Sequence, residues 1–197
     1  MSKMLSYILY IGAGISSILG LYTLYKTKKI YEKRRSFTID ISISWWLTDI
    51  AWITLVALSS LYNVWPLSIE TAIASVIGIL ILALGIILTL AGVLEFRSLH
   101  KISGMYDSKL ITTGVYSWSR NPQFLGFYLA LLGTSLLGKS GYALLLTVIA
   151  IIYCHYYIVE IEEPHLEHIF GAKYISYKLR TPRYIGFRRI NDNSGSK

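Results

Sequence analysis

Residues 69–94 read IETAIASVIGILILALGIILTLAGVL. Apart from Glu70 this run carries no charge, and it exceeds the roughly 20 apolar residues that a helix needs to cross a bilayer. The whole chain agrees with it, since its 197 residues are 54% hydrophobic and 15% charged, with a mean hydropathy of +0.51. These values are typical of a polytopic membrane protein rather than a soluble domain.

Four other segments of the chain are apolar enough to form membrane helices. They are residues 4–25, 41–62, 124–137 and 142–159. The third is short for a full crossing and is followed by Gly138-Lys139-Ser140-Gly141, a typical turn sequence. We therefore expect the last two segments to form a tight helical hairpin. The predicted fold is an all-α polytopic membrane protein with about five transmembrane helices.

Basic residues between the apolar segments indicate how the chain crosses the membrane, because Lys and Arg favour the cytosolic side. Residues 26–35, KTKKIYEKRR, hold six basic residues and one acid. The same bias marks residues 96–121 and the tail 165–197, so we expect the amino end outside and the carboxyl end in the cytosol. This placement accounts for the net charge of +8 without a nucleic-acid partner. We expect the first segment, too long for a signal-peptide core, to be retained.

Single residues within or beside the apolar segments carry further predictions. Trp45 and Trp46 near one end of segment 41–62, and Trp65 beyond the other, are typical of the membrane–water interface. Asp49 is either a functional intramembrane acid or a shallow one that reaches water or a lysine. Cys154 is the single cysteine, which excludes an internal disulfide and a multi-cysteine zinc site. Small residues that favour close helix packing recur in the first segment: Gly12, Gly14, Ser16, Ser17 and Gly20.

Two polar segments flank the predicted hairpin, residues 101–124 before it and residues 160–183 after it. Because a hairpin brings its own ends together, we expect these segments to be neighbours at the cytosolic face. Such elaborate loops usually carry a site.

The residue types in these two segments suit a zwitterionic ligand that also carries a flat ring. Tyr116, Trp118 and Phe124 can stack on a flat or cationic group. Glu162 and Glu163 can hold a hydroxyl pair or a positive charge. Backbone N–H groups around Gly114 and at the helix start near Pro122 favour a carboxylate. Together these features predict a pocket for an adenosine-bearing cofactor.

Two alternatives to a cofactor pocket stay open. The first is that Glu162 and Glu163 form ion pairs with arginines of the tail, while Arg120 anchors a phospholipid headgroup. The second is a metal site, since His165 and His168 lie at helical spacing with Glu162. We expect no metal, because the chain has four histidines in all and the other two lie elsewhere.

The sequence resembles a known family over residues 101–184. LITTGVYSWSRNPQFLG (110–126) is similar to the motif L-x-T-x-G-x-Y-x-x-x-R-H-P-x-Y-x-G. EIEEPHLEHIFGAKYISYKLRTPRY (160–184) is similar to E-E-x-x-L-x-x-x-F-G-x-x-Y-x-x-Y-x-x-R-x-P. In this order and spacing the two motifs resemble the isoprenylcysteine carboxyl methyltransferase and phospholipid methyltransferase superfamily.

The resemblance implies S-adenosylmethionine as cofactor and a set of site residues. The expected cofactor-binding residues, to which we add Gly114 for its backbone N–H, are Lys101, Ser108, Lys109, Leu110, Ile111, Tyr116, Asn121, Pro122, Gln123, Phe124 and Glu162. The expected catalytic residues are Arg120, which would lie between cofactor and acceptor, Arg180, which matches the motif arginine near the tail, and Glu163.

Three positions depart from the family pattern. Asn121 replaces the motif histidine and Phe124 the motif tyrosine, so no histidine base acts there. Eukaryotic carboxyl methyltransferases of this family carry a substrate-contacting arginine where this chain has Ile158.

These observations predict a single membrane domain over residues 1–197. Residues 1–95 would supply three spans, residues 96–184 the catalytic, cofactor-binding region, and residues 185–197 a frayed tail. The expected function is in-line methyl transfer to a lipid-borne acceptor that enters from the bilayer, with an isoprenylcysteine-like carboxylate favoured.

The chemistry of the acceptor leaves several functions open. A carboxylate acceptor needs no base and would be held by Arg120. An amine of a phospholipid would give its proton to Glu163 or Asp49. An NADPH-dependent reductase of the sterol type and a non-catalytic lipid-binding membrane protein are the further alternatives.

Overall fold

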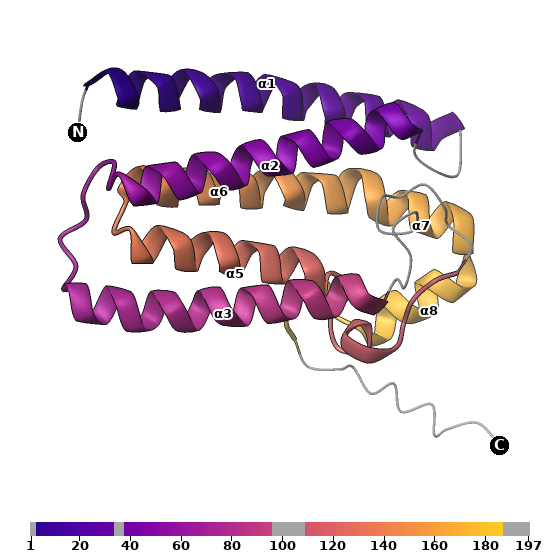
Figure 1. The fold of residues 1–197 in the computed structure, drawn as a ribbon. Helices are drawn as coiled ribbons and strands as arrows, with labels where there is room; N and C mark the ends of the chain where they lie inside the picture. The colour runs from indigo at the N-terminus through magenta and orange to yellow at the C-terminus, as the bar shows by residue number, and fades with distance from the viewer. Residues whose placement is uncertain (1–2, 34–37, 96–108, 187–197) are drawn as a thin grey trace.

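The computed structural model describes residues 3–33, 38–95 and 109–186, and every regular element in these ranges is helical. The elements are α1 (Lys3–Lys33), α2 (Ile39–Leu61), α3 (Thr71–Glu95), η1 (Gly114–Ser117), α5 (Pro122–Leu137), α6 (Gly141–Tyr157), η2 (Ile158–Glu162), α7 (Glu163–Phe170) and α8 (Ala172–Arg180). The long helices lie side by side, and η1, α7 and α8 gather at one end of this bundle (Figure 1). The predicted all-α fold is confirmed for the described residues.

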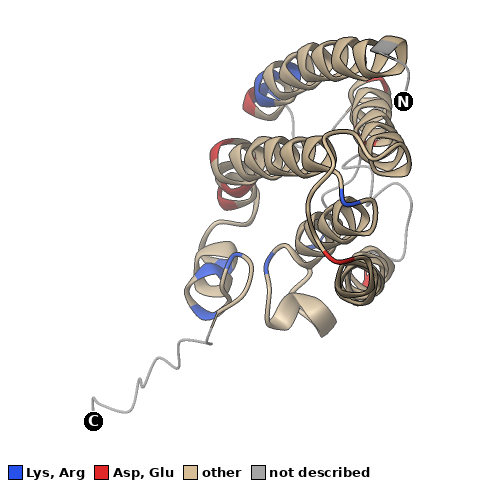
Figure 2. Ribbon diagram, turned by 90° about the vertical axis from the view of Figure 1, so that its left-hand side faces the viewer, with Lys and Arg blue, Asp and Glu red and all other residues tan. Residues whose placement is uncertain are grey.

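Four described segments are long and apolar enough to cross a membrane, namely Met4–Lys33, Ile39–Leu61, Thr71–Glu95 and Gly141–Phe170. The apolar helix α5 is shorter, with 16 residues. Most of the ribbon of the bundle helices carries no charge (Figure 2). Large side chains on the outside of α1, such as Ile8, Ile11 and Ile15, are exposed. An apolar outer face is expected where a helix contacts lipid.

The short helix α5 is held against α3 by glycines on both helices. The two helices run antiparallel (Figure 1). A Cβ atom on Gly85 would lie 2.4 Å from the backbone nitrogen of Ala130, and one on Gly126 would lie 2.4 Å from that of Thr89. Gly78 and Gly133 repeat the contact two turns further along. The backbones therefore approach closely, as small residues permit in membrane helix pairs.

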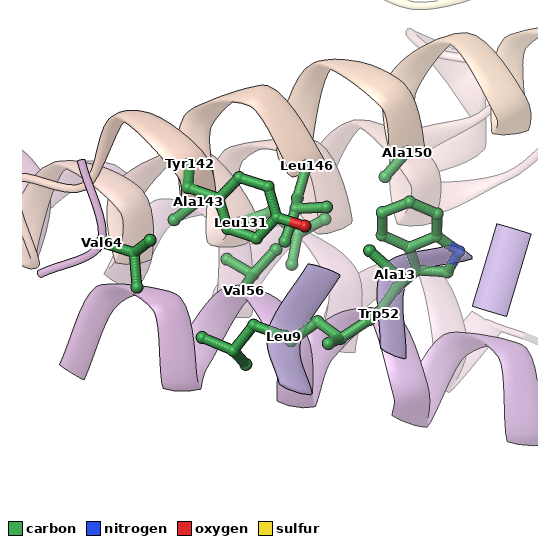
Figure 3. Packing of buried hydrophobic residues seen from close by; sticks show 11 residues of the cluster. Leu9, Ala13, Trp52, Val56, Val64, Leu131, Tyr142, Ala143, Leu146 and Ala150 are labelled. Carbon is green, nitrogen blue, oxygen red and sulfur yellow. The ribbon is translucent and has the colours of Figure 1, made fainter. Parts of the chain in front are cut away.

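A second set of contacts joins α1, α2, α5 and α6 through buried apolar side chains (Figure 3). The cluster consists of Leu9, Ala13, Trp52, Leu55, Val56, Val64, Leu131, Tyr142, Ala143, Leu146 and Ala150. Figure 3 shows Ala150 of α6 beside the Trp52 ring of α2. This packing lies away from α7 and α8, so polar residues can occupy that end of the bundle.

The close packing predicted for the first segment is confirmed at two of its glycines. A Cβ atom on Gly12 would lie 3.2 Å from Cδ2 of Leu55, and one on Gly20 would lie 3.0 Å from Cε2 of Tyr153. Gly14, by contrast, has nothing within 4 Å of such an atom. The α1–α2 contact is further held by Trp45 Nε1, which donates a 2.9 Å hydrogen bond to Thr27 Oγ1.

Two helices run further than the hydrophobic pattern predicts. α1 continues beyond residue 25 through Lys33, because Lys and Glu are good helix formers and no Gly or Pro interrupts the basic stretch. The last apolar segment ends at residue 159, and we expected Pro164 to stop or kink its helix, but the helical path continues past Pro164 as η2 and α7. Pro164 lies in the first turn of α7, where a missing backbone N–H costs little. Gly171, with φ of +52°, ends α7 instead.

The end of the bundle opposite α7 and α8 is closed by contacts between two turns. Ser140, which is fully buried, donates a 2.6 Å hydrogen bond from Oγ to the carbonyl of Val64 and accepts one from the backbone nitrogen of Ala143. The backbone nitrogen of Leu67 also donates to the carbonyl of Lys139 at 2.8 Å. Ser140 therefore caps α6 and links the α2–α3 turn to the α5–α6 turn.

Ser140→Ala is expected to lower the free energy of unfolding by about 1–2 kcal/mol, because it removes a helix cap and one of the two hydrogen bonds that the Val64 carbonyl accepts. A thermal melt of the detergent-purified protein measures the effect. Ser68→Ala, at an exposed position of the neighbouring turn, is the control and should melt with the wild type. Equal melting of both variants would show that the Ser140 contacts contribute nothing.

Candidate active site

A cavity of about 390 Å³ lies at the end of the bundle where η1, α7 and α8 gather. Its volume is within the range of roughly 300–1,000 Å³ that is usual for small-molecule sites. One part of the wall is charged or polar, and we call it the polar part: Lys109, Arg120, Asn121, Glu162, Glu163 and His165. The other is mostly apolar and aromatic, and we call it the inner part: Trp46, Asp49, Ile53, Phe127 and Cys154.

The two parts differ because helix ends line the polar part, whereas residues further along the helices line the inner part. Arg120 and Asn121 precede α5, and Glu163 begins α7, so polar side chains come from helix ends. Ile53 lies about four turns into α2 and Phe127 more than one turn into α5. The cavity thus extends from the polar end of the bundle into its apolar interior.

The loop before α5 and the tail after α8 hold each other by hydrogen bonds. Tyr177 Oη donates to the carbonyl of Tyr116 at 2.6 Å, and the backbone nitrogen of Arg120 donates to the carbonyl of Pro182 at 2.9 Å. Asn121 Nδ2 donates to the carbonyl of Arg183 at 3.1 Å. The prediction that the segments flanking the hairpin are neighbours in space is confirmed for these residues.

Glu163 is the centre of a buried ion cluster, which we define as Glu163, Arg120, Arg183 and Lys178. Arg183 binds the carboxylate with two nitrogens, Nε at 2.8 Å and Nη2 at 3.0 Å. Arg120 Nη1 lies 3.0 Å from Oε1, and Lys178 Nζ lies 3.7 Å from Oε2. The Glu163 side chain is only 5% exposed. The alternative of ion pairing with an arginine of the tail is therefore what the structure shows for Glu163.

Arg120 is held in a fixed orientation with one donor left over. Its side chain is 7% exposed, and Nη1 also donates to Tyr174 Oη at 3.3 Å. Nε is buried and has no hydrogen-bond partner among the described residues. A buried donor without a partner costs free energy, which an oxygen of a bound ligand would recover.

The π-helical segment η2 sets the direction of the two glutamates. A π turn adds a residue to an α-helix and rotates the side chains that follow it; such turns are frequent at functional sites. Glu162 and Glu163 follow one another in the chain, yet both line the cavity. Ile158 and Ile161 of the same turn are buried against Leu24 of α1.

Burial or a charged partner raises the pKa of four site groups outside the helical spans. Burial raises the pKa of the Tyr116 phenol above its usual range, and the charge of Glu162 raises it further. Burial also raises the pKa values of Tyr174 and Tyr177. These phenols stay protonated near neutral pH and can donate hydrogen bonds, but they cannot act as bases. The hydrogen bond to Glu163 raises the pKa of Arg183, so this cation keeps its charge.

The structure brings most of the expected site residues to one cavity. Those in its wall are Lys109, Leu110, Ile111, Tyr116, Arg120, Asn121, Gln123, Phe124, Glu162 and Glu163. Lys101 and Ser108 lie outside the described residues.

Three of the expected residues have other surroundings. Gly114, with φ of +54°, lies against the Glu95 side chain at the end of α3, where a Cβ atom would collide with the carboxylate. Pro122 is buried in the first turn of α5 and does not line the cavity. Arg180 lies at the end of α8, where Nε donates to the carbonyl of Ser176 at 3.2 Å and the side chain is exposed. Arg183, three residues later, is the arginine that reaches Glu163.

Several wall residues had no site role in the sequence. Trp45 and Trp46, predicted as interfacial markers, line the cavity beside Asp49. Tyr31 of α1 stacks on His165 with ring centroids 3.4 Å apart, so the basic extension of α1 reaches the cavity wall. In the ranges that the structure describes, no group of three His, Cys, Asp or Glu side chains is placed to hold a metal ion.

Comparisons with known proteins point to one family. A model of the family described as phospholipid methyltransferase matches residues 73–173. The chain is 33% identical over 130 residues to the protein-S-isoprenylcysteine O-methyltransferase of Saccharomyces cerevisiae, covering 64% of this chain and 54% of that protein. It is 31% identical over 166 residues to the protein of the same name from Xenopus laevis, covering 78% and 56%. The human protein is 31% identical over 147 residues, covering 68% and 51%.

The three matches cover similar shares of the relatives' length. The chain spans about half the length of the curated relatives it matches. No solved structure matches the chain. The family match runs from α3 to the start of α8 and includes Arg120, Glu162 and Glu163 of the cavity wall. Because it covers half of the sequence, the chain belongs to the phospholipid methyltransferase family.

Proposed function

We propose that this protein is an integral membrane methyltransferase that uses S-adenosylmethionine to methylate a lipid-borne acceptor, with a carboxylate favoured. The cavity carries this proposal, because one continuous space joins a charged polar part to an inner part between α2, α5 and α6. Methyl transfer to a lipid requires a polar cofactor and an apolar acceptor to meet at about 3–3.5 Å. The O-methyltransferase names of the relatives favour a carboxylate acceptor.

The proposal includes a topology of five crossings, with the amino end outside and the cavity facing the cytosol. In this arrangement α5 completes its crossing while largely covered by α3 and α6, as its short length requires. Basic residues near the cavity support the orientation, since Lys26, Lys29 and Lys33 lie at the end of α1 that reaches His165.

The polar part of the cavity suits the charges of S-adenosylmethionine. The wall holds two cations, Lys109 and Arg120, and three acids, Asp49, Glu162 and Glu163. Glu162 would bind the ammonium group or the ribose hydroxyls, and Lys109 would face the cofactor carboxylate. Tyr116 and Phe124 would stack on the adenine ring. Lys101 and Ser108, which lie outside the described residues, stay part of this proposed set.

Arg120 would orient the acceptor. S-adenosylmethionine supplies an electrophilic methyl group on a sulfonium sulfur, and a carboxylate oxygen can take it by in-line displacement without a base. Arg120 Nε would donate to that carboxylate, while Glu163 and Tyr174 hold the guanidinium in place. Arg180 stays a proposed catalytic residue, although it is exposed and would act from outside the cavity.

A second candidate is N-methylation of a phospholipid amine, which Asp49 favours. An amine must lose a proton before it can attack. Glu163, bound by three cations, is poorly suited to accept it. Asp49 lines the inner part of the same cavity and carries no such neighbours.

Calorimetric titration of S-adenosylhomocysteine into the detergent-purified protein tests the proposal. We expect saturable binding that Glu162→Gln weakens about 10- to 100-fold, through loss of a charged hydrogen bond. Glu167→Gln, on the exposed side of α7, is the control and should bind as the wild type does. Absence of binding in protein that elutes as one species and melts cooperatively would overturn the cofactor assignment. The same titration with NADPH would then test the reductase alternative.

A further inference from the structure

Asp49 lines the cavity, but the favoured reaction, methyl transfer to a carboxylate, gives it no role. It lies on α2 about 15 Å from the first residue of that helix. Its neighbours in the wall are Trp46 one turn before it and Ile53 one turn after it, with Cys154 contributed by α6. The inner part of the cavity is therefore apolar or aromatic except at this carboxyl group.

Asp49 has no protein partner among the residues that the structure describes. No hydrogen bond or ion pair joins it to any of them, and no cation offsets its burial. Glu163, by contrast, lines the same cavity and binds three cations. A carboxyl group within a membrane helix is costly unless something binds it. Because Asp49 faces the cavity, a ligand in the inner part is the group in position to do so.

We propose that Asp49 is a specificity-determining residue that binds a hydrogen-bond-donating group of the lipid-borne acceptor in the inner part of the cavity. This inference rests on the proposed function and adds a requirement to it. The acceptor must carry an N–H donor that reaches the inner part of the cavity. Arg120 binds the oxyanion at the polar part, and Asp49 binds the donor further inside.

Two kinds of acceptor offer such a donor. An S-prenylated cysteine carries an amide N–H close to its carboxylate, and an aminophospholipid carries an ammonium group. A neutral amide needs only an acceptor oxygen, whereas an ammonium group gains most of its binding from the negative charge. Asp49→Asn keeps an acceptor oxygen and removes the charge, so it distinguishes the two sources.

The experiment measures the affinity of four probes for protein saturated with S-adenosylhomocysteine, by calorimetry in detergent. N-acetyl-S-farnesylcysteine carries the amide N–H, and S-farnesylthiopropionic acid is the same molecule without the acetamido group. Phosphatidylethanolamine and phosphatidylcholine form the second pair, with and without N–H donors. The variants are Asp49→Leu and Asp49→Asn, and the control is Asp40→Asn, an exposed aspartate on the first turn of the same helix.

We expect the wild type to bind the N–H-bearing member of one pair about tenfold more tightly than its partner, the worth of one hydrogen bond to a charged group. Asp49→Leu should bring this ratio close to one without changing the affinity for S-adenosylhomocysteine, and Asp40→Asn should leave it unchanged. If the farnesyl pair shows the preference, Asp49→Asn should retain part of it. If the phospholipid pair shows it, Asp49→Asn should lose it.

The inference is overturned if the ratio is the same in the wild type and in both Asp49 variants, or if neither pair shows a preference in wild-type protein that binds S-adenosylhomocysteine. Failure of the wild type to bind S-adenosylhomocysteine would instead contradict the proposed function itself. Should Asp49→Leu not fold, the ratio in Asp49→Asn, which is nearly the same shape, decides between these outcomes.

Discussion

Gly85→Ala will separate α3 from α5 and lower the free energy of unfolding by about 3 kcal/mol or more, the upper range for overpacking a tight interface. The new methyl carbon would lie 2.4 Å from the backbone nitrogen of Ala130 and 2.7 Å from the carbonyl oxygen of Gly126. Both atoms belong to the α5 backbone, so no rotamer change can relieve the contact. The fraction of protein that elutes as a folded species in detergent, and its melting temperature, measure the loss.

Gly14→Ala is the matched control, because it makes the same chemical change in another apolar helix. A Cβ atom there has nothing within 4 Å, and alanine is a better helix former than glycine. We expect this variant to melt at or slightly above the wild-type temperature. If Gly85→Ala melted equally well, the close approach of α3 and α5 would be wrong.

The α3–α5 contact depends on a glycine spacing that the hydrophobic pattern of the sequence does not reveal. Glycines recur every seven residues on α3, at 78, 85 and 92, and on α5, at 126 and 133. Such spacing places them on one face of each helix. Close helix packing was predicted for the first segment instead, because small residues are denser there. Spacing alone does not say which helix will meet which, so the pairing required the structure.

The sequence predicted the parts of the helices whose length the bilayer determines. The apolar segments were located correctly, because the bilayer fixes a minimum length of apolar helix. The carboxyl ends of α1 and α7 were not predicted correctly. They lie beyond the apolar segments, where helix propensity and tertiary contacts determine where a helix ends. Tyr31 in the extension of α1 stacks on His165, which is a contact that no local pattern encodes.

The site could be predicted from chain topology better than from single residue types. The segments before and after the α5–α6 hairpin had to meet, and Arg120, Glu162 and Glu163 do share one cavity. The sequence could not identify the partner of Glu163, since Arg180 and Arg183 are both basic residues of the tail. After Thr181 the chain turns back along the loop before α5, as the bond from Arg120 N to Pro182 O shows. That turn carries Arg183 to Glu163.

Tryptophans near a helix end illustrate a further limit of the sequence. Trp45 and Trp46 have the spacing of interfacial residues, yet both line the cavity. The rotation of α2 about its axis decides whether a side chain faces lipid or the interior, and neighbouring helices set that rotation. The same rotation turns Asp49 toward the cavity.

Glu163→Gln should lower the free energy of unfolding by about 3 kcal/mol, the lower range for removing one partner of a buried ion pair. It leaves Arg120, 7% exposed, without its carboxylate, while Arg183 and Lys178 are partly solvated and suffer less. Because Arg120 also holds the loop before α5 to Pro182, the cavity wall should loosen as well. Thermal melts and S-adenosylhomocysteine titrations together measure both consequences.

Glu167→Gln provides the control for this variant, since it removes a carboxylate from the same helix and the same lysine. Glu167 pairs with Lys178 at the surface, where both side chains are more than a third exposed, so its loss should cost less than about 1 kcal/mol. The double variant Glu163→Gln with Arg120→Gln should recover part of the stability that Glu163→Gln loses, because the uncompensated buried cation is then gone. Equal melting of Glu163→Gln and Glu167→Gln would mean that the ion cluster does not hold the cavity wall together, and Arg120 would then need another source of its fixed orientation.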